Sequence, residues 1–146
     1  RQLGISADGI TSLDRTRGNP DRHVVLRGGE GQPNYRAADV MRAAALVAKE
    51  QVARSVMVDC SHDNSGKDHT RQTAVGRDVL AQVAAGQQAI MGVMIESNLH
   101  AGQQKWQSGA TLAHGVSITD ACIGWDETEA FLYEAANTVK GIAPAA

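Results

Sequence analysis

The sequence is poor in aromatic residues, in cysteine, in basic charge and in long hydrophobic runs. It has two Trp, two Tyr and one Phe, too few rings for the stacking platforms that bind nucleic-acid bases. The formal net charge is -2, so the basic surface of a nucleic-acid-binding protein is not expected either. The longest apolar run covers residues 89–95, whereas a membrane-spanning helix needs about 20 residues. We therefore expect neither nucleic acid nor a membrane as a partner.

The two cysteines and the chain length set further limits. Cys60 and Cys122 lie far apart and form no disulfide framework, which predicts a reducing, cytoplasmic setting. The 146 residues fit one domain but not a complete (β/α)8 barrel, which needs about 250 residues. Residue 1 is Arg rather than Met, so we expect the start of the gene product to lie upstream.

Apolar runs and turn residues predict a hairpin followed by three strand–helix units. Strands at residues 5–7 and 10–13 flank Asp8-Gly9, a strong signal for a two-residue hairpin turn, and turn residues at 16–21 close the hairpin. Short apolar strands that alternate with helices predict an α/β fold whose parallel strands are buried on both faces. The predicted strand–helix pairs are residues 23–26 with 35–52, 55–60 with 68–85, and 89–95 with 127–139 after a long polar loop.

Polar residues follow each predicted strand, at positions 35 and 34 residues apart: Arg27, His62 and Glu96. Because the carboxyl ends of parallel strands form one rim, we expect these side chains to converge there. Arg27 is followed by Gly28 and Gly29, whose N–H groups could meet an anion beside the guanidinium. The alternative is an arginine paired with a core carboxylate.

His62 and Glu96 are also candidate metal ligands, with Asp120 as a third. Imidazole nitrogen and carboxylate oxygen suit Mn, Fe, Co or Zn. The alternative is a hydrogen-bonded histidine and a helix-capping aspartate. Four loop residues could either contact a phosphate or cap the loop: Ser61, Asn64, Ser65 and Lys67. Cys60 and Cys122 could each be either a reactive thiol or a packing residue of the core. The remaining histidines are expected on the surface or in loops: His23, His69, His100 and His114.

Four sequence blocks carry a family resemblance. They are HVVLRGG at 23–29 with PNY at 33–35, MVDCSHDNSGK at 57–67, GVMIES at 92–97 with GQ at 102–103, and SITDACIGW at 117–125. In this order they resemble the type I 3-deoxy-D-arabino-heptulosonate 7-phosphate (DAHP) synthases of bacteria and fungi, over nearly the whole chain. The resemblance implies the carboxyl-terminal part of a TIM barrel, with about three βα units (strands six to eight). Residues 1–18 would be an inserted regulatory β-hairpin and 19–146 the catalytic portion.

The resemblance also implies an activity: a metal-dependent transferase that condenses phosphoenolpyruvate with erythrose 4-phosphate to give DAHP and phosphate, the first step of the shikimate pathway to the aromatic amino acids. His62, Glu96 and Asp120 match three of four ligands of one divalent metal ion (Mn, Fe, Co or Zn). His62 and Asp120 would be catalytic, and Arg27 and Asp120 would bind substrate. The fourth ligand, a cysteine, and a Lys-Pro-Arg-Thr type motif that grips erythrose 4-phosphate have no match here, so this chain alone is expected to be inactive.

Regulation and alternatives complete the expectations. By resemblance, Gly4 and Asp14 mark a feedback site for Tyr or Phe on the hairpin, Gly4 leaning toward Tyr, and the parent enzyme would be a homo-oligomer. An open part of a barrel is also expected to expose apolar surface. One alternative is a non-catalytic metal- or phosphate-binding α/β module or a regulatory fragment. Another is the related octulosonate synthase that uses arabinose 5-phosphate, against which the block at 117–125 argues.

Overall fold

The structure is a computed structural model that describes residues 2–14, 19, 21–49 and 56–141. Most of the turn expected at 16–21 and the helix end expected at 50–52 lie outside the described residues. The elements are β1 (Gln2–Ile5), β2 (Thr11–Asp14), β3 (Val24–Leu26), α1 (Ala37–Ala48), β4 (Val56–Asp59), α2 (His62–Ser65), the 3-10 helix η1 (His69–Arg71), α3 (Gln72–Ala84), β5 (Ile90–Met94) and α4 (Trp125–Lys140).

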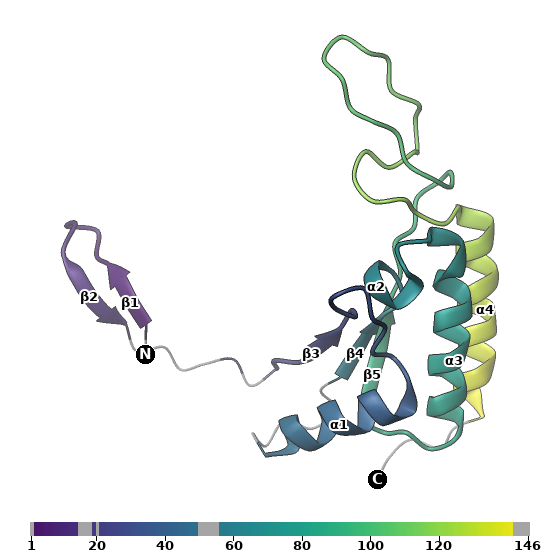
Figure 1. The fold of residues 1–146 in the computed structure, drawn as a ribbon, viewed down its shortest axis with the longest axis horizontal. Helices are drawn as coiled ribbons and strands as arrows, with labels where there is room; N and C mark the ends of the chain where they lie inside the picture. Colours follow the sequence, from purple (N-terminus) through teal and green to yellow (C-terminus); the bar gives the residue numbers. More distant parts are fainter. Residues whose placement is uncertain (1, 15–18, 20, 50–55, 142–146) are drawn as a thin grey trace.

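The hairpin exists, with a wider turn than the sequence predicts. β1 and β2 pair antiparallel, with Leu3 opposite Leu13. Ser6 N donates to Ile10 O at 2.9 Å, and Gly9 N donates to Ser6 O at 2.9 Å, so residues 6–10 form the turn. The expected strand at 5–7 is therefore wrong beyond Ile5. Figure 1 shows the hairpin apart from the body. In agreement, Leu3 and Ile5 are each 79% exposed.

The body is an α/β unit around a parallel sheet, as the sequence predicts. The strand order is β3-β4-β5, and the register aligns Leu26 with Val58 and Asp59 with Met94. The carboxyl ends of the three strands therefore lie side by side at one edge. The helix expected at 68–85 is present as η1 followed by α3: Asp68 caps η1 by accepting from Thr70 N at 3.0 Å, and α3 continues to Ala84.

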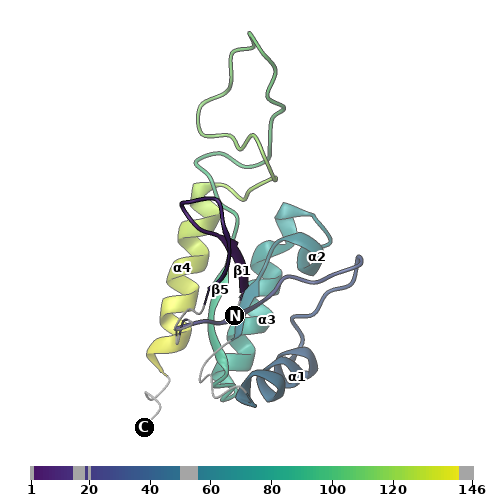
Figure 2. The ribbon, with the colours of Figure 1, turned by 90° about the vertical axis from the view of Figure 1, so that its left-hand side faces the viewer.

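One face of the sheet forms the core. Val56, Val58 and Cys60 are fully buried there and pack with Val40 of α1 and Val75 of α3. Figures 1 and 2 show α1 at the lower end of α3.

The described residues cover the opposite face only in part, which corrects the expectation of strands buried on both faces. It carries Val25, Met57 and Met94. Val25 pairs with Met57, and Met94 pairs with Asp59, which lies on the same side of β4 as Met57. Val25 and Met94 are 36% and 40% exposed, because α1 and α3 both pack on the face that holds Val58. An apolar run identifies a buried strand but does not say which segment covers each face.

Helix α4 docks on α3 through one aromatic ring. Phe131 is 1% exposed, and it lies so close to Gly76 that a Cβ added there would be 2.5 Å from the ring Cζ. Thr73 Oγ1 also donates to Glu127 Oε1 at 2.9 Å. No helix among the described residues is long and apolar enough to cross a membrane.

The long polar loop expected before α4 forms an arm that projects from the body (Figures 1 and 2). Isolated bridges close its base, pairing Gly102 with Cys122 and Gln103 with Ser117. The Gln104 amide links the two sides of the arm: Nε2 donates to Ala113 O at 2.8 Å, and Oε1 accepts from Ala113 N at 2.8 Å. These contacts fix the strip of chain that carries Asp120.

Candidate functional site

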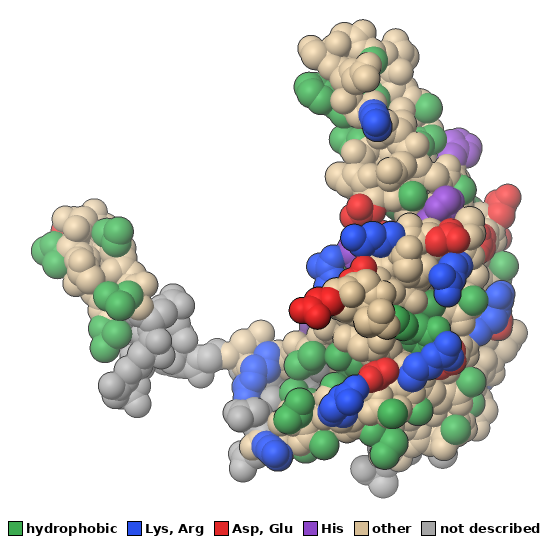
Figure 3. Space-filling view, viewed as in Figure 1, with side chains coloured by type: hydrophobic (Ala, Val, Ile, Leu, Met, Phe, Trp, Pro, Cys, Tyr) green, Lys and Arg blue, Asp and Glu red, His purple; other side chains and the backbone are tan. Residues whose placement is uncertain are grey.

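A pocket of about 540 Å³ lies at the carboxyl ends of the three parallel strands. Its lining includes Arg27 after β3, His62 after β4, Glu96 after β5 and Asp120 from the base of the arm. The structure thus brings together the residues that the sequence placed on one rim, and their binding roles stay predictions. Figure 3 shows acidic and basic side chains gathered at the foot of the arm.

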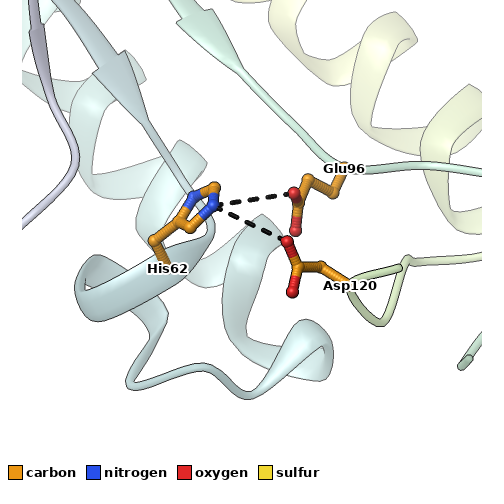
Figure 4. A group of neighbouring side chains, drawn as sticks. All are labelled: His62, Glu96 and Asp120. Carbon is orange, nitrogen blue, oxygen red and sulfur yellow. Dashed lines mark ion pairs between the residues drawn. The ribbon is translucent and has the colours of Figure 1, made fainter.

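Three of these side chains could share a metal ion. His62 Nε2 lies 3.8 Å from Glu96 Oε1 and 4.0 Å from Asp120 Oδ2, and Figure 4 shows the three side chains pointing toward one another. Each offers one ligand atom, and these atoms lie within 4.8 Å of one another. Two atoms bound to one ion at about 2.0–2.2 Å are at most about 4.4 Å apart, so the two ion-pair distances fit a shared ion. The donors are one imidazole nitrogen and two carboxylate oxygens, which suit Mn, Fe, Co or Zn.

His62 is held by unusual local backbone, which the sequence did not reveal. It begins α2 rather than ending β4, and its φ is +50°, a left-handed conformation that costs a non-glycine residue about 1–3 kcal/mol. Its buried Nδ1 lies 2.8 Å from Asp59 Oδ2, while Asp59 Oδ1 accepts from Ser61 N at 2.8 Å. Nδ1 makes no hydrogen bond to this carboxylate despite the short distance, and Nε2 is directed at Glu96 and Asp120.

Glu96 is positioned by two polar side chains. Ser61 Oγ donates to Glu96 Oε2 at 2.6 Å, so the other carboxylate oxygen faces His62. The fully buried Gln72 holds the backbone: its Oε1 accepts from Glu96 N at 2.8 Å and its Nε2 donates to Glu96 O at 3.2 Å. Sequence reasoning missed Gln72, because nothing in the pattern of a single amide at a helix start predicts a contact with a distant strand end.

The loop after Arg27 differs from the expectation in one respect. Gly28 N donates to Asn34 Oδ1 at 2.7 Å, and Gly29 N donates to Gln32 O at 3.0 Å, so neither N–H group is free to meet an anion. The prediction that the N–H groups of Gly28 and Gly29 meet an anion is therefore wrong. Among the described residues, however, no ion pair involves Arg27, and with Lys67 it supplies positive charge to the pocket lining.

Replacing Gly28 with Ala is expected to damage this loop. An added Cβ would lie 2.6 Å from Asp63 Cβ and 2.8 Å from Gln32 O, and the Gly28 φ is +76°. Overlap and left-handed backbone together should lower the free energy of unfolding by about 1–3 kcal/mol, measured by urea denaturation. Gly29→Ala is the matched control, since nothing lies within 4 Å of its Cβ position, and we expect a change within about 0.5 kcal/mol. Equal effects of the two substitutions would contradict the prediction.

The other candidate residues fall mainly into structural roles. Asn64 and Ser65 are buried, and Ser65 Oγ donates to His62 O at 3.1 Å, which supports the loop-capping interpretation for both. His23, His100 and His114 are exposed, whereas His69 is half-buried. Ser61 lines the pocket, as does Lys67.

Both cysteines support the packing interpretation. Burial, followed by the charge of Asp59, raises the pKa of Cys60 to about 12, and burial raises the pKa of Cys122. β4 ends at Asp59, so Cys60 does not share a strand face with His62, and it packs in the core cluster instead. The reactive-thiol interpretation of Cys60 is therefore not supported.

Cys60 is therefore expected to resist alkylation in the folded protein. Only the thiolate reacts with iodoacetamide, and a pKa of about 12 leaves almost none at pH 8. Mass spectrometry after timed labelling should find Cys60 unmodified without denaturant and modified in concentrated urea. Equal labelling rates in the two conditions would contradict a buried, neutral thiol.

The sequence matches known proteins over most of its length. A family model described as the DAHP synthetase I family matches residues 2–133. The chain is 46% identical over 142 residues to the Tyr-sensitive phospho-2-dehydro-3-deoxyheptonate aldolase of Escherichia coli (strain K12), which covers 97% of this chain and 40% of that protein. It is 46% identical over 138 residues to the Phe-sensitive enzyme of the same strain, covering 94% of this chain and 39% of that protein.

A solved structure agrees with these matches. Phospho-2-dehydro-3-deoxyheptonate aldolase from Francisella tularensis SCHU S4 superposes with a TM-score of 0.82 at 38% identity, covering 98% of this chain and 41% of that chain. The chain thus spans about 40% of the length of the relatives that it matches.

Proposed function

The chain belongs to the DAHP synthetase I family, and from this premise we propose that it forms part of an enzyme that condenses phosphoenolpyruvate with erythrose 4-phosphate to DAHP and phosphate. The reaction would be the first step of the shikimate pathway, in the cytoplasm. The observation that carries the proposal is the pocket in which His62, Glu96 and Asp120 face one another beside Arg27. Relatives named phospho-2-dehydro-3-deoxyheptonate aldolase align with nearly the whole chain.

We propose that residues 19–146 supply strands six to eight of a (β/α)8 barrel and that residues 1–18 are an inserted hairpin. Three parallel strands in sequential order, helices on one face of the sheet and apolar side chains on the other support this assignment. In a barrel the inner face of each strand packs against side chains from other strands, which would cover Val25 and Met94.

His62, Glu96 and Asp120 would hold one divalent metal ion: Mn, Fe, Co or Zn. The fit rests on the donor types and on the two ion-pair distances from His62 Nε2. A bound ion would supply a Lewis acid for the aldehyde of erythrose 4-phosphate.

The side chains of this chain would bind and orient the two substrates. The Arg27 guanidinium offers a planar fork for the phosphate or carboxylate of phosphoenolpyruvate, and its position beside the acidic cluster would hold the enol carbon near the aldehyde. The enol carbon forms a bond to the aldehyde carbon, water adds to the phosphate-bearing carbon, and phosphate leaves with C–O cleavage. Asp120, whose side chain is 71% exposed, would contact the aldehyde substrate together with His62.

The hairpin would serve regulation. Gly4 lies in β1 and Asp14 in β2, and we propose that they border a site for Tyr or Phe in a homo-oligomeric enzyme. The names of the matched relatives include Tyr-, Phe- and Trp-sensitive enzymes, so family membership supports feedback control but does not select the amino acid.

The proposal is tested by binding and turnover with the 146-residue chain. Calorimetry should detect the binding of Mn²⁺ and of phosphoenolpyruvate to the chain. If neither ligand binds, the proposed site is overturned. An assay for phosphoenolpyruvate consumption with erythrose 4-phosphate should detect almost no turnover, because this sequence has no match to the fourth ligand or to the Lys-Pro-Arg-Thr motif. Rapid condensation by this chain would contradict that expectation.

A further inference from the structure

Helix α2 (His62–Ser65) connects two parts of the pocket. His62 is its first residue, and Asn64 follows two positions later with a buried side chain that is not in the pocket lining. A buried primary amide is stable in a protein only when its donors and acceptor find partners. The partners of Asn64 therefore show what this helix holds in place.

The Asn64 amide bridges the ends of two neighbouring strands. Its Nδ2 donates to Leu26 O at 2.9 Å and to Asp59 O at 2.8 Å. Leu26 is the last residue of β3, directly before Arg27, and Asp59 is the last residue of β4. One side chain thus ties the strand that leads to the arginine to the strand that leads to the histidine.

The same amide also anchors the loop that follows Arg27. Asn64 Oδ1 accepts from Asn34 N at 2.7 Å, and Asn34 Oδ1 in turn accepts from Gly28 N at 2.7 Å. The neighbouring Asp63 supports this loop as well, because its Oδ2 accepts from Gly31 N at 3.1 Å. The backbone on both sides of Arg27 is therefore fixed to α2, whose first residue is His62.

We propose that Asn64 is a positioning residue that fixes the Arg27 backbone relative to His62, so that the anion site and the metal site are held as one unit. The inference rests on the proposed function, in which an anion on Arg27 must lie beside the metal ligands. A displacement of about 1 Å between reacting groups can cost about 100-fold in rate, so a rigid connection between the two strand ends matters. Asn34 has a narrower role, because its side chain contacts Gly28 and not β4.

Two alanine substitutions separate these roles. Asn64→Ala removes the link to both strand ends, and we expect the affinities for Co²⁺ and for phosphoenolpyruvate each to fall about tenfold or more, as for other residues behind metal ligands. Asn34→Ala removes only the contact with Gly28, so phosphoenolpyruvate affinity should fall while Co²⁺ affinity stays within about twofold of wild type. Asn137→Ala, at an exposed position of α4, is the control and should change neither.

Each ligand is titrated in the absence of the other, into the 146-residue chain. Visible absorption of Co²⁺ reports both its affinity and its coordination geometry, which purely structural damage elsewhere would leave unchanged. Calorimetry measures phosphoenolpyruvate, and circular dichroism with thermal melting checks that each variant is folded. If Asn64→Ala fails to fold, the contrasting effects of Asn34→Ala on the two ligands still test the proposal.

The outcomes are distinguishable from failure of the proposed function. A folded Asn64→Ala variant with wild-type affinity for both ligands would overturn the inference while leaving the proposed site intact. Equal losses of both affinities in Asn34→Ala would also overturn it, because the side chain of Asn34 does not reach β4. A wild-type chain that binds neither Co²⁺ nor phosphoenolpyruvate would overturn the proposed function, and the inference with it.

Discussion

Replacing His62 with Ala should lower the affinity of the chain for Mn²⁺ or Co²⁺ by more than about 100-fold. Residues that only support a metal ligand typically cost 10–100-fold when mutated, and His62 supplies the single nitrogen among the three candidate ligand atoms. The substitution also leaves Glu96 and Asp120 as two carboxylates with no imidazole between them. Isothermal titration calorimetry on the purified variant measures the change.

The control for this experiment is another histidine of the same chain. His114 is exposed in the arm, between the bridged segments, so His114→Ala should leave metal affinity unchanged. The thermal midpoint of each variant shows whether the fold is kept. Metal affinity that is unchanged in a folded His62→Ala variant would show that these three residues do not form the metal site.

Replacing Phe131 with Ala should cause the largest loss of stability in this chain. Phe131 is 1% exposed and fills the contact between α3 and α4, and truncation of a buried Phe typically costs about 3–5 kcal/mol. A domain is stable by only about 5–15 kcal/mol, so the urea midpoint should fall steeply. Leu132→Ala, at a 54% exposed position of the same helix, is the matched control with a small expected effect.

Gly76 makes the Phe131 prediction more specific. Gly76→Ala alone should destabilise the chain by about 1–3 kcal/mol through overpacking, because its Cβ would lie 2.5 Å from the Phe131 ring. When Phe131 is already Ala, the same substitution should be neutral or stabilising, since the space is empty and Ala favours a helix over Gly by about 1 kcal/mol. Additive effects in the double variant would contradict direct contact between the two positions.

The positions of the strand ends were predictable from the sequence. Apolar runs of four to seven residues end at polar side chains, and parallel strands must bring their carboxyl ends to one edge. That reasoning placed Arg27, His62 and Glu96 near one another, and the pocket contains all three. The family followed from long motifs in a fixed order, which chance does not produce, and the matched relatives confirm it.

Local backbone detail was not predictable in the same way. Gly28 N and Gly29 N donate to Asn34 Oδ1 and Gln32 O of their own loop, which Asn64 holds from another segment. The φ of His62 is left-handed although this residue is not a glycine. A glycine pair in a sequence shows that a turn is possible. Whether its N–H groups face a ligand or the protein depends on how the loop folds back on itself, and the contact with Asn64 in another segment helps to fix that fold.

By itself, then, the sequence determined which residue types end each strand, the order of the elements and the family, because hydrophobic periodicity and motif order are local properties of the chain. Only the tertiary structure decided how Asp120 reaches His62 across the base of the arm, how Gln72 and Ser61 hold Glu96, and which face of the sheet is covered. These contacts join residues 24 to 58 positions apart. Packing selects such contacts from many that the sequence alone would permit, because their geometry depends on several elements at once.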